Sequence, residues 1–294
     1  MRGAKPQRAL ELAILRNQAL RDGVSILIAC SGGPDSVALA ALMRVAAQKR
    51  RWTLTIAHVN HGLRRSADQD EAVVLHVAAA LQLKVKTVQL CGVERDESSL
   101  RNARYAALQR VAKDVGAQTV VTGHTAEDQT ETVLLALFRG TGTNGLTGMA
   151  ECRRLALGVE LCRPLLRETH AELQRYCQAA CLPYALDPTN EDLKYRRNAV
   201  RSALGVLRGA FPGLDRAVAR AAYIAAQESA DAPRANLRRR VRAALNESGQ
   251  LHDIDFEHIE SAVRALESGR SGTFHASRRA VLHVGRGQVT VKER

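Results

Sequence analysis

Two segments of the sequence combine residue types that bind phosphate with residue types that carry negative charge. The first is SGGPDS, residues 31–36, which interrupts an apolar run and precedes apolar residues at helical spacing. Glycines let the backbone approach an anion closely, and the first N–H groups of a helix have no partner within that helix. An ordinary strand–helix turn has a similar composition. The whole pattern favours a phosphate loop, with hydroxyl donors at Ser31 and Ser36.

The second segment runs from Gly123 to Met149 and begins directly after an expected strand. Its polar side chains recur at helical spacing: His124, Glu127, Asp128 and Glu131. An acidic first turn would complement the helix dipole, which is one interpretation. A transition-metal site is another, but no further His or Cys lies at ligand spacing. Carboxylates that bind a cationic substrate and Mg²⁺ fit the segment better.

Three further segments add polar and basic groups. The sequence HVNHG, from His58, follows an expected strand, and open α/β sheets bind ligands at the carboxyl ends of their strands. Arg101 and Arg104 lie three residues apart, on one face of an expected helix. A basic cluster follows at Lys194, Arg196, Arg197 and Arg201. These arginines are typical of a solvated face, or of contacts with nucleotide or RNA phosphates.

The elements that would position these groups alternate along the first two-thirds of the chain. Expected strands are 25–29, 54–59, 85–90 and 119–122, and expected helices are 67–81, 98–115 and 126–138. This alternation predicts an α/β fold with a doubly wound, mostly parallel sheet covered on both faces. Residues 215–268 look helical throughout, and residues 280–291 read as a hairpin. We therefore expect a boundary near residue 205, with a catalytic domain at 1–205 and a smaller, mainly helical, basic domain at 206–294.

Composition narrows the class of protein. The 294 residues include 43 Lys and Arg against 30 Asp and Glu, and a net charge of +13 suits a polyanionic partner, although coding bias would also produce it. No apolar run is long enough to span a membrane, and the first 23 residues predict an amphipathic helix rather than a signal peptide. The scattered cysteines favour reduced thiols in a cytoplasmic protein, without a zinc or iron–sulfur site; they are Cys30, Cys91, Cys152, Cys162, Cys177 and Cys181.

The motifs together carry a family resemblance. SGGPDS is neither GxxxxGK[ST] nor GxGxxG, and it resembles the pyrophosphate loop of the N-type ATP pyrophosphatases. Over residues 24–205 the chain is similar to the shorter form of the tRNA(Ile)-lysidine synthetase family. The residues that carry this similarity are HVNHGLRRSADQDE, RNARYAAL, GHTAEDQTETVLLALFRGTGTNGLTGM, RPLL and DPTNEDLKYRRNAVR.

The resemblance implies a PP-loop fold and an ATP-dependent ligase. Its expected activity joins L-lysine to C2 of the wobble cytidine of CAU-anticodon tRNA(Ile), through an adenylated cytidine, with release of AMP and pyrophosphate. Mg²⁺ is the implied metal, held by Asp35. The implied ATP-binding residues are Ser31, Gly32, Gly33, Pro34, Asp35, Ser36 and His58, and the implied catalytic residues are Asp35, Arg104, His124 and Asp128.

Lysine would be bound by Asp128 and Glu131, and which carboxylate accepts the proton of its amine stays open. Residues expected to contact tRNA are Arg64, Arg196, Arg197 and Arg201, together with the basic C-terminal domain. Whether the protein forms a homodimer is also left open. Two rival functions remain at this stage. One is another adenylating enzyme of the same fold, such as a thiolase, although the Cys pairs of thiolases are missing; the other is a non-catalytic nucleotide-binding module with an RNA-binding tail.

Overall fold

The structure is a computed structural model that describes residues 4–60, 67–90, 96–185, 196–228, 233–247, 256–275, 280–285 and 288–293. The chain forms two compact units. Residues 1–129 and 149–219 make the first, and residues 130–148 and 220–294 make the second. The predicted boundary near residue 205 lies inside a helix of the first unit, and the position of a domain boundary there stays a prediction.

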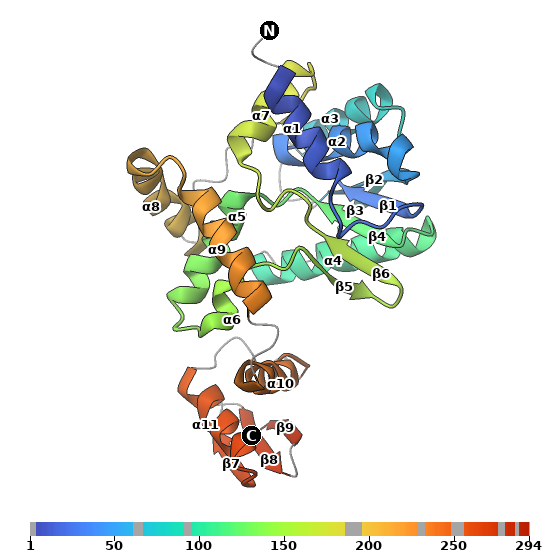
Figure 1. The fold of residues 1–294 in the computed structure, drawn as a ribbon. Helices are drawn as coiled ribbons and strands as arrows, with labels where there is room; N and C mark the ends of the chain where they lie inside the picture. Colours follow the sequence, from blue (N-terminus) through green and yellow to red (C-terminus); the bar gives the residue numbers. More distant parts are fainter. Residues whose placement is uncertain are drawn as a thin grey trace. The chain divides into compact units, whose positions relative to one another are not determined.

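Helices and strands alternate along the first unit (Figure 1). Its elements are α1 (Ala4–Leu15), β1 (Ser25–Ala29), α2 (Pro34–Arg50), β2 (Thr53–Asn60), α3 (Ala67–Ala80), β3 (Lys84–Gln89), α4 (Glu97–Asp114), β4 (Thr119–Thr122), β5 (Cys152–Ala156), β6 (Val159–Cys162), α7 (His170–Ala179) and α8 (Arg196–Ala210). Two more helices begin in this unit and end in the other: α5 (Ala126–Leu137) and α9 (Leu214–Glu228). The four predicted strands and three predicted helices are confirmed to within one or two residues.

The six strands form one sheet in the order β3-β2-β1-β4-β6-β5. All neighbours are parallel except β5 and β6. Successive side chains of a strand point to opposite faces of the sheet. In β1, Ile26 and Ile28 pack in the core on one face, and Leu27 packs in the core on the other face. Helices α1, α2, α3 and α7 supply the first core and α4 the second. The predicted doubly wound sheet, covered on both faces, is confirmed.

The antiparallel pair β5–β6 was not predicted from the sequence. Its strands are short, and β5 is one of the two edge strands of the sheet, with Arg153 and Arg154 exposed. Charged edge strands discourage pairing with another chain, but they also hide the alternation of apolar and polar residues that marks a strand. The pair positions Arg163, which directly follows the last residue of β6.

The second unit has its own apolar core. It contains α6 (Thr143–Leu146), α10 (Pro233–Glu247), α11 (Phe256–Glu267), β7 (Gly272–His275), β8 (Ala280–Gly285) and β9 (Gln288–Glu293). Val241 and Leu245 of α10 and Val263 of α11 pack with Leu282 and Val284 of β8. The predicted closing hairpin is β8–β9, and β7 extends it to a three-stranded antiparallel sheet.

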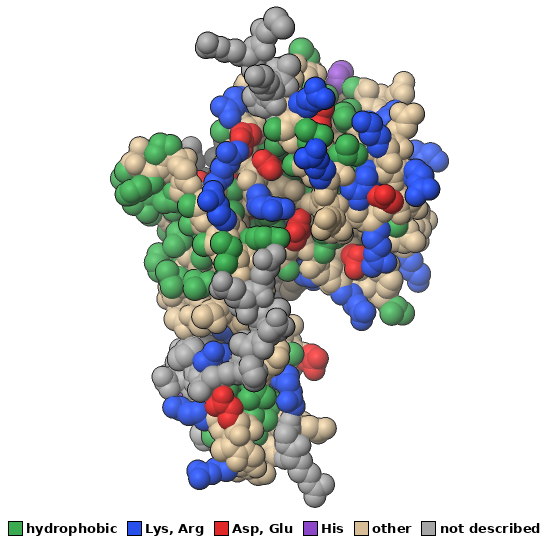
Figure 2. Space-filling view, viewed as in Figure 1, with side chains coloured by type: hydrophobic (Ala, Val, Ile, Leu, Met, Phe, Trp, Pro, Cys, Tyr) green, Lys and Arg blue, Asp and Glu red, His purple; other side chains and the backbone are tan. Residues whose placement is uncertain are grey.

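Surface side chains show no single basic stripe on the face in Figure 2. Lys and Arg are scattered over this face, so net charge alone does not locate a surface for a polyanion. Apolar side chains gather over α8. Val206 of this helix is 79% exposed, and Phe211, which directly follows the helix, is 61% exposed. Within the described ranges, no helix has the length and apolarity needed to cross a bilayer.

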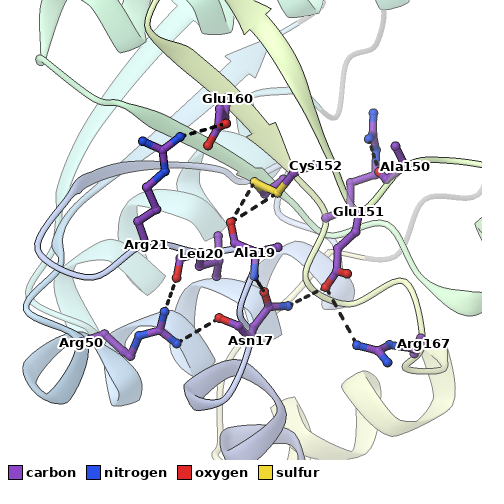
Figure 3. Close-up of a disulfide and its surroundings, with 12 residues drawn as sticks. Asn17, Ala19, Leu20, Arg21, Arg50, Ala150, Glu151, Cys152, Glu160 and Arg167 are labelled. Carbon is purple, nitrogen blue, oxygen red and sulfur yellow. Dashed lines mark hydrogen bonds and ion pairs between the residues drawn. A yellow bond between two sulfur atoms is a disulfide. The ribbon is translucent and has the colours of Figure 1, made fainter. Parts of the chain in front are cut away.

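A disulfide joins Cys152 of β5 to Cys162 of β6, which corrects the expectation that all cysteines are reduced thiols (Figure 3). Arg163 N–H donates to the carbonyl oxygen of Glu151, so the two cysteines form a non-hydrogen-bonded pair. In such pairs the strands approach most closely, and the two Cα atoms are 4.2 Å apart. Cys30, Cys177 and Cys181 are free thiols, whereas Cys91 lies outside the described residues.

Reduction of this disulfide is expected to lower the free energy of unfolding by about 2–3 kcal/mol, because the bond closes a loop in the unfolded chain. The loop is short, with a sequence separation of 10, so the effect is modest. Urea unfolding with and without reductant measures it. Cys152→Ser should show the same loss without reductant, and Cys181→Ser, at an exposed free thiol, should not. Alkylation of all six cysteines in the unreduced protein would contradict the prediction.

Candidate active site

The polar loops predicted from the sequence meet where the order of the sheet reverses. The chain proceeds from β1 to β2 and β3 on one side, then returns to β4 on the other side of β1. Loops that leave neighbouring strands in opposite directions open a crevice at this point, and open α/β sheets bind ligands there. The SGGPDS loop follows β1, and the His124 loop follows β4. The fold therefore brings the two predicted segments to the same crevice.

The SGGPDS loop is shaped by hydrogen bonds to Ser36. Its hydroxyl donates to the carbonyl oxygen of Gly33 at 2.9 Å, and it accepts from Ser31 N–H at 3.1 Å. The hydroxyl of Ser31 lies 3.2 Å from it and is exposed. Gly32 has a φ of +93°, and an added Cβ would lie 3.1 Å from the carbonyl oxygen of Asp70. Ser36 thus holds the loop closed, whereas Ser31 is the hydroxyl open to a ligand.

Helix α2 begins in this loop without a capping side chain. Gly33 is the N-cap, Pro34 follows it, and no side chain bonds the free N–H groups of the first turn. Uncapped N–H groups and the positive end of the helix dipole form an anion site. These are the features that a diphosphate group requires.

Three helices begin around the crevice, and their first turns are linked. An added Cβ on Gly123 would lie 3.0 Å from the carbonyl carbon and oxygen of Asp35, so the loop before α5 touches the first turn of α2 main chain to main chain. The carboxylate of Glu127 accepts twice from the N–H of His170, at 3.0 Å, and so caps α7. Burial raises the pKa of Glu127. The first turns of α2, α5 and α7 are therefore held as one unit.

Asp35 points at the first residue of α7. Its Oδ1 lies 2.7 Å from Nδ1 of His170, and its side chain is 26% exposed. The hydrogen bond to Asp35 raises the pKa of His170, which favours the charged ring. One carboxylate oxygen of Asp35 is thus engaged, while the side chain keeps access to solvent.

Asp128 is held by two contacts in the first turn of α5. Its Oδ2 accepts from Thr125 N–H at 3.0 Å, and its Oδ1 accepts from Arg197 at 3.2 Å. Arg197 comes from α8, and the ion pair is largely shielded from solvent, with the two side chains 19% and 24% exposed. The sequence placed Arg197 among residues that contact tRNA; the structure adds that it contacts Asp128.

Two histidines stand beside the crevice. His58 lies inside β2, with Asn60, rather than in a loop after the strand; its Nδ1 donates to the carbonyl oxygen of Cys30, at 2.9 Å, and its Nε2 is buried without a partner in the described structure. His124 follows β4, and its Nδ1 lies 2.8 Å from the hydroxyl oxygen of Thr122. Burial, reinforced by Arg163 and Arg104, holds the pKa of His124 well below its ordinary value. Its ring is therefore neutral and acts through hydrogen bonds.

Arg104 lies against Tyr105, and other guanidinium groups surround the same ring. The guanidinium carbons of Arg101 and Arg104 are both 5.7 Å from its centroid, and that of Arg153 is 5.1 Å away. Arg163 is almost fully buried nearby and donates to the carbonyl oxygen of Ala150 at 2.7 Å. This concentration of positive charge near His124 suits an anionic ligand.

For the remaining predicted site residues, the structure gives at most a position and no contact that tests their role. Glu131 lies one turn beyond Asp128 on α5 and is 1% exposed. Arg201 is on α8 and half-buried, and only the backbone of Arg196 is described. Arg64 lies outside the described residues. All of these assignments to tRNA or lysine stay predictions.

Sequence reasoning missed His170, Tyr105, Arg153 and Arg163 as site residues. A signal for His170 existed, because Thr169 and Glu172 form a capping box that marks the start of α7. It would have placed a helix there, but not its contact with Asp35. RPLL was noticed as a motif, without a role for its arginine.

The residues present fit Mg²⁺ in the way that phosphate-binding enzymes hold it. Mg²⁺ is often bound by one or two carboxylates and by the oxygens of substrate phosphates. Asp35 supplies one carboxylate beside the uncapped start of α2. In the described part of the chain, no group of three or more His, Cys, Asp or Glu side chains is arranged to hold a metal ion by itself.

Known proteins that are similar to this chain have a phosphate-binding fold of the same class. Residues 6–207 match the family model described as the PP-loop domain, so the chain carries a PP-loop domain. The U34-tRNA thiolase NcsA from Methanococcus maripaludis shares the fold, with a TM-score of 0.62 at 18% identity over 74% of this chain and 76% of that chain.

Two curated relatives, both named tRNA(Ile)-lysidine synthase, identify the family within the PP-loop proteins. The relative from Salinispora arenicola is 35% identical over 96% of this chain and 82% of its own length. The relative from Symbiobacterium thermophilum is 38% identical over 64% of this chain, which covers only 40% of that protein. The chain belongs to the tRNA(Ile)-lysidine synthase family.

Proposed function

We propose that the protein ligates L-lysine to C2 of the wobble cytidine of CAU-anticodon tRNA(Ile), with ATP and Mg²⁺. The observation that carries this proposal is the joining of an uncapped phosphate loop to an acidic helix start through Gly123. Such a crevice binds the leaving pyrophosphate on one side and a cationic nucleophile on the other. Membership of the family supports the choice of substrates, because the relatives are named tRNA(Ile)-lysidine synthase.

In the first step, the C2 carbonyl oxygen of the cytidine attacks the α-phosphate of ATP, and pyrophosphate leaves. The N–H groups of Gly32, Gly33, Asp35 and Ser36 and the Ser31 hydroxyl bind the pyrophosphate. Asp35 would hold Mg²⁺, which would neutralise the charge of this leaving group. Arg104 stabilises the negative charge that develops on the transferred phosphate. The neutral ring of His124 donates or accepts a hydrogen bond there. The target base has to leave its stack, which costs less in an anticodon loop than in a duplex.

In the second step, the ε-amine of lysine attacks C2 and displaces AMP. The amine is a nucleophile only after it loses a proton. Asp128 orients the ammonium group and accepts that proton, with Glu131 as the second candidate. Lysine then takes the place on Asp128 that Arg197 occupies in this structure. Arg197 is thereby released toward the phosphates of the RNA.

The test supplies labelled lysine, ATP, Mg²⁺ and an unmodified tRNA(Ile) transcript with a CAU anticodon. Label incorporated into the RNA, with one AMP per lysine, is the expected result. A methionine-specific tRNA with the same anticodon is the matched control and should remain unlabelled. Incorporation of sulfide in place of lysine would identify a thiolase. ATP binding without any turnover would identify a nucleotide-binding module, and either result would overturn the proposal.

A further inference from the structure

Four arginines surround Tyr105 without a carboxylate partner. We call Arg101, Arg104, Arg153 and Arg163 the arginine cluster; they come from α4, from β5 and from the residue after β6. In the described structure, none of the four forms an ion pair with Asp or Glu. The nearby Asp128 pairs instead with Arg197. Like charges gathered in this way repel one another, and a bound anion removes the repulsion.

Arg163 brings a buried polar atom to the cluster. Its guanidinium group interacts with the hydroxyl of Tyr105, and its Nε is buried without a hydrogen-bond acceptor among the described residues. Tyr105 is 8% exposed and Arg163 only 2%. A buried polar group without a partner costs free energy and calls for a ligand or a water molecule that satisfies it. Together with the four clustered guanidinium groups, this buried donor favours an anion of phosphate size.

The arginine cluster lies at a different position along the sheet from the phosphate loop, so the anion that it binds is not the pyrophosphate. The phosphate loop follows β1, whereas Arg163 follows β6, two strands away. Neighbouring strands are about 4.8 Å apart, so the two positions are separated by about 10 Å across the sheet. His58, a predicted ATP contact, lies on β2, which is on the opposite side of β1. ATP thus occupies the β2–β1 side, and the acceptor approaches from the β4–β6 side.

We propose that Arg101, Arg153 and Arg163 of the arginine cluster bind a backbone phosphodiester of the RNA acceptor next to the target nucleotide, beside Arg104, which acts on the transferred phosphate. This inference rests on the proposed function and adds where the RNA is held. Arg101 and Arg153 are exposed and reach outward, which suits an RNA backbone better than a nucleotide enclosed in the crevice. Guanidinium groups match the geometry of phosphate oxygens. Backbone contacts of this kind fix the register of an RNA without reading its sequence.

The chain offers a matched pair for the test in Arg153 and Arg154. They are consecutive on β5, so their side chains point to opposite faces of the sheet. Arg153 faces Tyr105, whereas Arg154 lines a cavity of about 230 Å³ with Thr119, Gly158 and other residues at the amino ends of β4 and β6. Both are exposed, so glutamine at either position should leave the fold intact.

Binding of tRNA(Ile) transcript, of an unrelated tRNA and of ATP is measured over a range of salt. Arg153→Gln is expected to weaken binding of both RNAs about 5- to 10-fold at low salt and to reduce the salt slope by about 1. ATP affinity should change by less than about twofold. Arg101→Gln should behave in the same way, and Arg154→Gln should leave the salt slope unchanged.

Other outcomes overturn the inference. Equal effects of Arg153→Gln and Arg154→Gln would show that the cluster makes no special contact with RNA. A loss of ATP affinity without a loss of RNA affinity would assign the cluster to the nucleotide, and no RNA binding by the wild-type protein would also refute it. Lysine incorporation, measured separately, keeps the two proposals apart. Its absence together with the expected change in salt slope would refute the proposed function alone.

Discussion

Asp35→Asn is expected to lower the rate of tRNA-dependent pyrophosphate release by about 100- to 1,000-fold. Asparagine has nearly the same shape, and its side-chain oxygen still accepts from Nδ1 of His170. The change therefore removes a negative charge while it preserves the contact between α2 and α7. That charge is what holds Mg²⁺ beside the leaving pyrophosphate in the proposed mechanism.

Asp114→Asn is the matched control for this measurement. Asp114 is the last residue of α4 and is exposed. It lies near the start of β4, at the amino ends of the strands, whereas the crevice lies at their carboxyl ends. Asp114→Asn removes one negative charge from the protein, as Asp35→Asn does, but at a position away from the crevice. Pyrophosphate release should therefore stay within about twofold of the wild-type rate. If Asp35→Asn also kept its activity at saturating Mg²⁺, Asp35 would have no role in the chemistry.

The second large effect is expected at Asp128. Asp128→Asn should slow transfer of lysine by about 100-fold or more, because an amide does not accept the proton of the amine. Adenylation of the RNA should be affected much less, so adenylated RNA should accumulate. The new side chain still accepts from Thr125 N–H, which keeps the start of α5 capped. Rapid-quench assays that follow AMP and pyrophosphate separately distinguish the two steps.

Glu131→Gln is the comparison that tests this assignment. Glu131 lies one turn further along the same helix and is the other candidate base. If Glu131→Gln blocked lysine transfer and Asp128→Asn did not, the two roles would be exchanged. If both variants slowed adenylation instead, the acidic turn would act on ATP rather than on lysine.

Local patterns predicted much of the fold because its central parallel strands, β1 and β4, are buried on both faces. SILIA and TVVT read as strands from five and four letters alone, and their observed bounds are the predicted ones. The β5–β6 pair escaped prediction because its strands are short and partly charged. Helices α7 and α8 were not predicted: α7 lies between the RPLL and DPTNEDLKYRRNAVR motifs, and α8 begins inside the second of them.

The site was predictable as a set of loops but not as a set of contacts. SGGPDS and the His124 segment were found because glycine and carboxylate patterns carry a local physical meaning. The contact of Asp35 with His170 joins residues 135 apart in sequence, and no spacing rule reaches that far. The arginine cluster likewise draws on three separate elements around one ring. Arg197 was predicted to contact tRNA, which stays a prediction, and its contact with Asp128 in this structure was not foreseen.

The contact at Gly123 has a mechanical consequence. Where two main chains touch with nothing between them, no rotamer change can absorb a displacement. In the proposed mechanism, a shift of β4 against β1, caused by a substitution deep in either apolar core, changes the distance between the leaving group and the nucleophile. Reaction rate in this protein should therefore respond to core packing more sharply than folding stability does.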